Sequence, residues 1–227
     1  VLLDRATNLM ALTCMRIKGN PPSQDLEYGA RDALNRIQWL LQKSLGTTEG
    51  DSRAPQPYGD LSLLDTNRVI LEAVGDSLLK DILDDGLNLL ETSAAIFESN
   101  GDCALNIKAS KWCRFMDEKS RQLAPGDNRE AIESGQWHCN QSCRETSMAA
   151  IASGMPADQP CNGGIRIFAV PIKAGNDIVG SINIGYGDPP KDEAVLEELA
   201  QKYGTSKDEL AMQAQKYHCR PPFIIEQ

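Results

Sequence analysis

Four cysteines in one stretch of the chain are the residues whose type and spacing could do chemistry. They are Cys113, Cys139, Cys143 and Cys161. The middle pair stands at i and i+4, so on a helix the two sulfurs lie on one face about one turn apart. Four thiolates are the ligand set of a closed zinc site or an iron–sulfur cluster, and soft sulfur favours these over magnesium or calcium. The pattern therefore indicates a shared metal or cluster site.

The residues alone leave further roles open for the same cysteines. Free Cys is often buried as a small apolar side chain, and the Cys-x-x-Cys spacing of many zinc sites is absent. Two of the thiols could instead form a reversible disulfide, which would make the protein a thiol-based redox sensor. A structural zinc domain is a further alternative. Cys14, Cys103 and Cys219 are predicted to be structural.

The histidines give little support for an enzyme. The chain has two of them, His138 and His218, and each precedes a cysteine. Adjacent helical residues point about 100° apart, so His138 would not reach the Cys139 thiol as a general base. With two His and no paired carboxylates in a recognisable setting, a hydrolase triad has little material. We therefore predict a protein without catalytic residues, with a Cys nucleophile as the alternative.

Aromatic and polar residues near the cysteines are candidates for a ligand pocket. Three aromatic side chains flank the cysteines in a chain that is only 5% aromatic, and such rings can wall a site for a small ligand. Three polar side chains alternate with apolar ones on a predicted hairpin. The predicted ligand-binding residues are Trp112, Phe115, Trp137, Arg166, Asn183 and Tyr186. Ordinary packing and solvent exposure are the alternatives.

The elements that must position these residues are predicted as two β-hairpins with helices between and around them. Turn signals and alternating apolar residues place the strands at 92–97, 104–107, 165–172 and 178–186. Amphipathic patterns place the last helices at 192–203 and 206–217. The order indicates an α+β domain with a small antiparallel sheet that helices cover on one side. The other face would be free to enclose a ligand.

The beginning of the chain has a different sequence pattern, which predicts helices without strands. Apolar residues at helical spacing predict two helices before residue 46, and a stretch rich in Gly, Pro and polar residues follows at 46–60. We predict a helical hairpin or signalling linker at 1–58 and a second domain at 59–227. The apolar stripe of the hairpin could form the seam of a homodimer. Because the chain begins at Val1 without an initiator Met, it reads as a piece of a longer protein.

Composition excludes several classes of protein. The 227 residues are 41% hydrophobic and 24% charged, a globular balance, and the formal net charge is -9. No basic cluster is present, so direct binding of nucleic acid is not expected. No apolar run is long enough for a membrane span. Seven cysteines without a secretory signal indicate reduced thiols and a cytoplasmic location.

The second domain resembles a PocR-type sensory domain, a relative of the PAS and GAF sensor folds. The segments that carry the resemblance are 112–115, 135–143, 161–164 and 169–185. The resemblance implies a PAS/GAF-like antiparallel sheet flanked by helices, and it places the family's cysteine cluster on the four cysteines above. In this chain Asn162 stands where the family pattern leads us to expect His.

The resemblance also implies a function. Such domains are small-molecule sensors at the front of bacterial histidine kinases and transcription regulators. We therefore expect a ligand-binding sensory module. It would sense a small molecule, carry a four-cysteine zinc or iron–sulfur site, or do both. No output module is visible in the sequence, so the downstream effector domain is expected outside this chain.

Overall fold

The computed structural model describes residues 56–80, 83, 92–215 and 217. The helical hairpin predicted at 1–58 lies outside the described residues except for its last three positions, as do Cys14, His218 and Cys219. The predicted domain boundary and dimer seam therefore stay predictions. Within the described ranges, every helix is too short or too polar to cross a bilayer.

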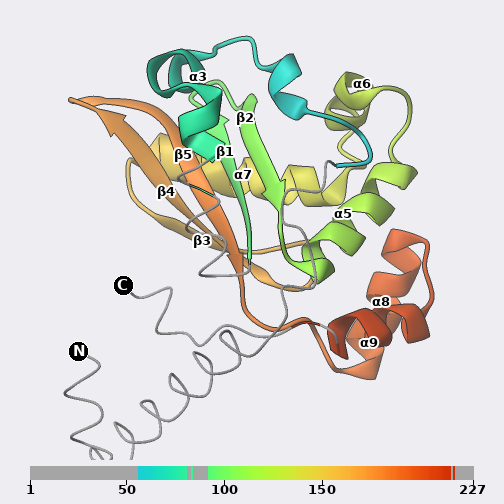
Figure 1. The fold of residues 1–227 in the computed structure, drawn as a ribbon. Coiled ribbons are helices and arrows are strands. Elements are labelled where there is room, and N and C mark those ends of the chain that lie inside the picture. The colour runs from blue at the N-terminus through green and yellow to red at the C-terminus, as the bar shows by residue number, and fades with distance from the viewer. Residues whose placement is uncertain (1–55, 81–82, 84–91, 216, 218–227) are drawn as a thin grey trace, which may run out of the picture. The chain divides into compact units, whose positions relative to one another are not determined.

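A five-stranded antiparallel sheet forms the centre of the domain (Figure 1). The strand order is β2-β1-β5-β4-β3. The bounds are β1 Ser93–Glu98, β2 Cys103–Lys108, β3 Ala157–Pro160, β4 Arg166–Ala174 and β5 Asp177–Tyr186. The predicted α+β fold class, with a PAS/GAF-like sheet flanked by helices, is confirmed. Both predicted hairpins are present as β1–β2 and β4–β5, whereas β3 was not predicted.

Strand β1 shows how the sheet is packed. All six of its residues are buried, and successive side chains point to opposite faces. Phe97 belongs to one apolar cluster, with the helices after β2, and Ile96 belongs to another, with Ile70 and Leu71. Along β1 the sheet is therefore packed on both faces, which corrects the prediction of cover on one side only. At the hairpin turn, Gly101 adopts a φ of 84° that favours glycine.

Three helices connect the two hairpins. They are α5 Lys111–Leu123, α6 Asn128–Glu133 and α7 His138–Ser153. Helix α5 begins where the Ser110 hydroxyl accepts a hydrogen bond from the backbone N–H of Cys113. Helix α6 begins with a reciprocal capping box between Asp127 and Glu130. Figure 1 shows α7 running along the sheet, with contacts to β3, β4 and β5.

Short helices precede and follow this unit. They are η1 Leu61–Leu64, α3 Val69–Val74, α8 Glu193–Tyr203 and α9 Lys207–Gln215. The last two confirm the predicted C-terminal helices. The N-cap of α3 is Arg68, with a φ of 54°. Asp65 accepts hydrogen bonds from the backbone N–H groups of Asn67 and Arg68, so it holds the turn before the helix.

Candidate functional site

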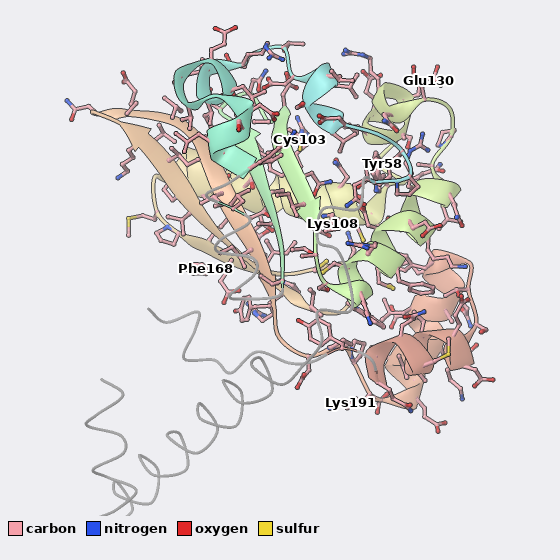
Figure 2. All side chains as sticks on the ribbon, viewed as in Figure 1. Tyr58, Cys103, Lys108, Glu130, Phe168 and Lys191 are labelled. Carbon is pink, nitrogen blue, oxygen red and sulfur yellow. The ribbon has the colours of Figure 1, made fainter. Side chains whose placement is uncertain are left out.

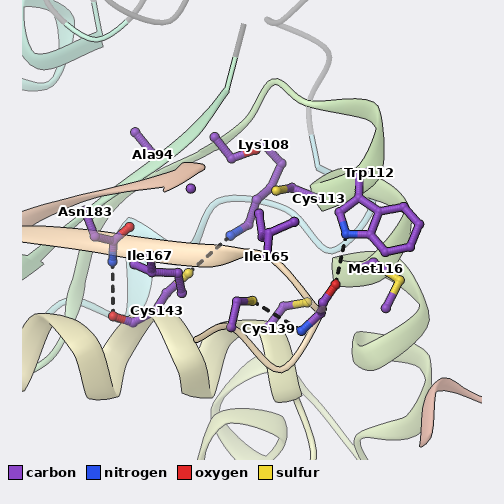
Figure 3. A pocket seen from close by; sticks show the side chains of 14 residues that line it. Ala94, Lys108, Trp112, Cys113, Met116, Cys139, Cys143, Ile165, Ile167 and Asn183 are labelled. Carbon is purple, nitrogen blue, oxygen red and sulfur yellow. Dashed lines mark hydrogen bonds between the residues drawn. The ribbon is translucent and has the colours of Figure 1, made fainter. Parts of the chain in front are cut away.

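A narrow cavity lies between the sheet and helices α5 and α7 (Figure 3). Ser93 pairs with Lys108 across β1 and β2, and Asn183 pairs with Ala95, two positions after Ser93. The period of two along a strand therefore directs Ser93, Lys108 and Asn183 to one face. The cavity has a volume of about 30 Å³. Organic ligands need roughly 300–1,000 Å³, so the cavity suits a group of few atoms.

All four predicted metal-ligating cysteines line this cavity. Cys113 comes from the first turn of α5, Cys139 and Cys143 come from successive turns of α7, and Cys161 follows β3. The structure thus brings together four thiols from three separate segments. None of them forms a disulfide. Cys103, at the other end of β2 from Lys108, does not line the cavity (Figure 2).

Each of three thiols has a different polar neighbour. Cys139 Sγ lies 3.8 Å from the hydroxyl of Tyr203 on α8. Cys161 Sγ accepts a hydrogen bond from the backbone N–H of Gly163 at 3.3 Å. Cys143 Sγ accepts one from the ammonium of Lys108 at 3.7 Å. The sulfurs are therefore held around the cavity by contacts with β2, the loop after β3, and α8.

Lys108 is a site residue that the sequence analysis missed. It is only 5% exposed, and among the described residues the hydrogen-bond partner of its ammonium is Cys143 Sγ. Burial opposes its charge, but the neighbouring Cys143 and Asp117 raise the pKa of Lys108 well above its ordinary value. A Lys in a strand is usually solvent-exposed, so no sequence signal distinguishes this one.

Burial makes the cavity thiols weak acids. It raises the pKa of Cys139 and Cys143, and it raises the pKa of Cys161 to about 12. Neighbouring thiols add to each rise because two negative charges repel. A protonated thiol is a poor nucleophile. The alternative of an enzyme with a Cys nucleophile therefore gains no support from these three residues.

The positions of the thiols decide whether they could hold a single metal ion. Among the residues that the structure describes, no group of three or more His, Cys, Asp or Glu side chains is placed so that it could hold a metal ion. A zinc ion would draw four sulfurs to about 2.3 Å from one point. Here the thiols line a cavity of about 30 Å³. The thiols are thus gathered at one cavity but not closed around a single point.

Two of the predicted ligand-binding residues line the cavity. Trp112 is buried, and its indole N–H donates to the Gly163 carbonyl at 3.0 Å. The Asn183 side-chain amide donates to the Cys143 carbonyl at 3.0 Å and to the Ser147 hydroxyl at 2.9 Å. Their polar groups therefore fix the loop of Cys161 and helix α7. Both residues position the walls of the cavity.

The remaining four predicted ligand-binding residues do not line the cavity; they are Phe115, Trp137, Arg166 and Tyr186. Trp137 donates from its indole N–H to Asp117 at 2.9 Å. Phe115 lies 5.4 Å from the Lys119 ammonium. Arg166 and Tyr186 both contact Asp158 at the edge of the sheet. The period of two explains this last pair, because each stands one position along its strand from a residue that lines the cavity.

An open groove lies on the other side of α5. Its volume is about 470 Å³, and it is lined by Pro57, Tyr58, Glu118, Arg121, Gln122, Asp127 and Asn128. Arg121 donates to the Asn128 side chain and to the carbonyls of Ala124 and Gly126. Its guanidinium is thus already engaged in holding the loop between α5 and α6. The groove has the size of an organic-ligand site but few uncommitted polar groups.

Comparison with known proteins gives a match over most of the domain. A family model described as a sensory domain found in PocR matches residues 72–222. This span contains both hairpins, the connecting helices and every cysteine of the cavity. No curated protein and no solved structure matches the chain.

Proposed function

The chain belongs to the family of the sensory domain found in PocR, and from that premise we propose that it senses through an iron–sulfur cluster. The ligands would be Cys113, Cys139, Cys143 and Cys161. The observation that carries this proposal is the convergence of these four thiols on one buried cavity. Cysteine thiolates are the usual ligands of such clusters.

A cluster suits the spacing of the thiols better than a single ion. A cluster would share the four thiolates among two or more irons, so they need not converge on a single point. A single zinc ion would draw them to one point. The four thiols line one cavity without converging on a point, and this arrangement supports a cluster over a single ion. A structural zinc ion is the alternative, and it would require the thiols to turn inward.

Residues around the cluster would shield it from water and connect it to the rest of the domain. When bound, an iron–sulfur cluster supplies one-electron redox chemistry with a potential set by its surroundings. Trp112, Met116 and Ile165 line the cavity with apolar surface that excludes water. The contact between Cys139 Sγ and the Tyr203 hydroxyl, at 3.8 Å, joins the site to α8. Through that contact a change at the site would reach the C-terminal helices.

A panel of alanine variants tests this proposal. Protein purified without oxygen is assayed for iron, acid-labile sulfide and visible absorbance. We expect each of C113A, C139A, C143A and C161A to lose most of its iron and absorbance. The matched control is C103A, which removes a buried thiol outside the cavity and should keep both. Equal iron in all five variants would contradict the proposal.

A small organic molecule in the groove beside α5 is a second candidate for the signal. Its volume of about 470 Å³ falls within the usual range for such ligands. The test is a thermal-shift series with small carboxylic acids, amines and alcohols. Gln122→Trp should fill the groove and abolish any rise in melting temperature, whereas Gln201→Trp on α8 should not. A rise that survives Gln122→Trp would exclude the groove.

The setting of the domain is part of the same proposal. We place the parent protein among bacterial histidine kinases and transcription regulators, with its effector domain elsewhere in the protein. A cytoplasmic location and a homodimeric state, with the helices of residues 1–58 at the seam, complete this setting. Crosslinking of the purified chain, with and without residues 1–58, tests the dimer.

A further inference from the structure

A buried ammonium that faces the thiols calls for an explanation of its own. Lys108 stands at the end of β2 with 5% exposure, and its side chain points into the cavity toward Cys143 (Figure 3). An ammonium has three donors. In the described structure they meet one soft acceptor, Cys143 Sγ at 3.7 Å. A buried ammonium in contact with a candidate ligand is placed to offset negative charge that a bound group brings into the cavity.

Asp117 offsets part of this buried charge. Its carboxylate lies near enough to influence Lys108, but its two oxygens already accept from the Tyr58 hydroxyl at 2.5 Å and the Trp137 indole at 2.9 Å. Lys108 makes no ion pair within 4.0 Å among the described residues. The polar atom to which it donates therefore belongs to a candidate cluster ligand.

We propose that Lys108 is the counter-charge of the loaded site and that it sets the reduction potential of the bound cluster. Four thiolates bring more negative charge than a cluster core can neutralise, and one buried ammonium offsets part of the excess. The Lys108 ammonium donates a hydrogen bond to the thiolate of Cys143. This inference rests on the proposed function, because it assigns a role to Lys108 toward that same site.

The direction of the effect follows from electrostatics. Reduction adds an electron to the site, and a nearby positive charge stabilises the reduced form more than the oxidised form. Hydrogen bonds to the sulfur atoms act in the same direction. Lys108 therefore raises the reduction potential. Removal of its charge should shift the midpoint to a more negative value.

The experiment compares the midpoint potentials of reconstituted proteins. The variants are K108M, which keeps the length of the side chain without its charge, K108Q, which keeps a donor without the charge, and K108R, which keeps the charge. The matched control is K119M, which removes the charge of a partly exposed lysine on α5 that pairs with Glu209 at 3.6 Å. Iron content, the circular dichroism spectrum and a dye-mediated redox titration are measured for each.

The expected result is a midpoint shifted to negative values in K108M and K108Q, and a midpoint near wild type in K108R and K119M. K108Q that folds but takes up less iron than K119M also supports the proposal, because the counter-charge is then needed for loading. Fully loaded K108Q or K108M with the wild-type midpoint would overturn it. A wild-type protein that binds no iron would instead overturn the proposed function, together with this inference.

Discussion

At the scale of single residues, a buried hydrogen-bond network ties the start of the domain to α5. Asp117 is 1% exposed and accepts from both Tyr58 and Trp137. The Tyr58 hydroxyl also accepts from the Asn106 side chain at 3.2 Å, and its ring lies 4.6 Å from that of Trp137. A buried carboxylate is tolerated because it is hydrogen-bonded, so each donor in the network matters.

Tyr58→Phe should therefore destabilise the domain by about 1–3 kcal/mol, because it leaves Asp117 short of a donor. Urea denaturation measures the change. The control is Tyr186→Phe, which removes the hydroxyl contact with Asp158 on the exposed edge of the sheet and should cost less than about 0.5 kcal/mol. Equal losses in the two variants would show that the network around Asp117 adds nothing.

At the scale of elements, the start of α5 joins a helix cap to the site. The Ser110 hydroxyl accepts from the backbone N–H of Cys113 at 3.0 Å, so the residue that begins the helix also fixes a candidate ligand. Asp192 caps α8 in the same way, through Ala194 and Val195, away from the cavity. The Ser110 cap therefore contacts a residue of the cavity, whereas the Asp192 cap does not.

Ser110→Ala and Asp192→Ala should each cost about 0.5–2 kcal/mol of stability, because each removes a cap. Only Ser110→Ala should also speed the loss of iron from the loaded protein to a chelator, since it frees Cys113. The measurements are urea denaturation and chelator-challenge kinetics. Identical rates of iron loss in the two variants would contradict the coupling of this cap to the site.

Helix α3 gives a prediction about pH. Its Ile70 N–H donates to Glu98 at 2.8 Å, and burial raises the pKa of Glu98 above its ordinary value. A raised pKa in the folded state means that folding disfavours the ionised form. The contribution of Glu98 to stability should therefore fall as pH rises from about 4.5 through the raised pKa.

Glu98→Gln should remove that dependence. The difference in unfolding free energy between wild type and variant is expected to shift in favour of the variant as pH rises through this window. Denaturation at a series of pH values measures it. A difference that stays constant from below to above the window would show that Glu98 titrates alike in the folded and unfolded states.

At the scale of the whole molecule, the sequence predicted the fold better than the site. Turn signals and alternation located both hairpins, and the match to the PocR family confirms the resemblance. Strand β3 was missed because it has only four residues, which are at most partly buried and show no apolar pattern. Packing of β1 on both faces was missed because one face is covered by residues outside the hairpins.

The site could be predicted only in part, for reasons that are physical. The i, i+4 spacing placed Cys139 and Cys143 on one face of a helix, but the approach of Cys161 depends on how the loop after β3 packs. Asn183 and Tyr186 were grouped although an odd step of three along a strand puts them on opposite faces. The burial of Lys108 depends on tertiary packing that no local pattern shows.

The most direct test of the account is the content of iron and acid-labile sulfide, with the visible spectrum, of the wild-type chain purified without oxygen. We predict iron and sulfide in comparable amounts and a brown absorbance that fades on exposure to an oxidant. Stoichiometric zinc without colour would contradict the cluster and make the four cysteines a structural site. Protein free of metal would contradict both and turn the search to thiol redox chemistry and the groove beside α5.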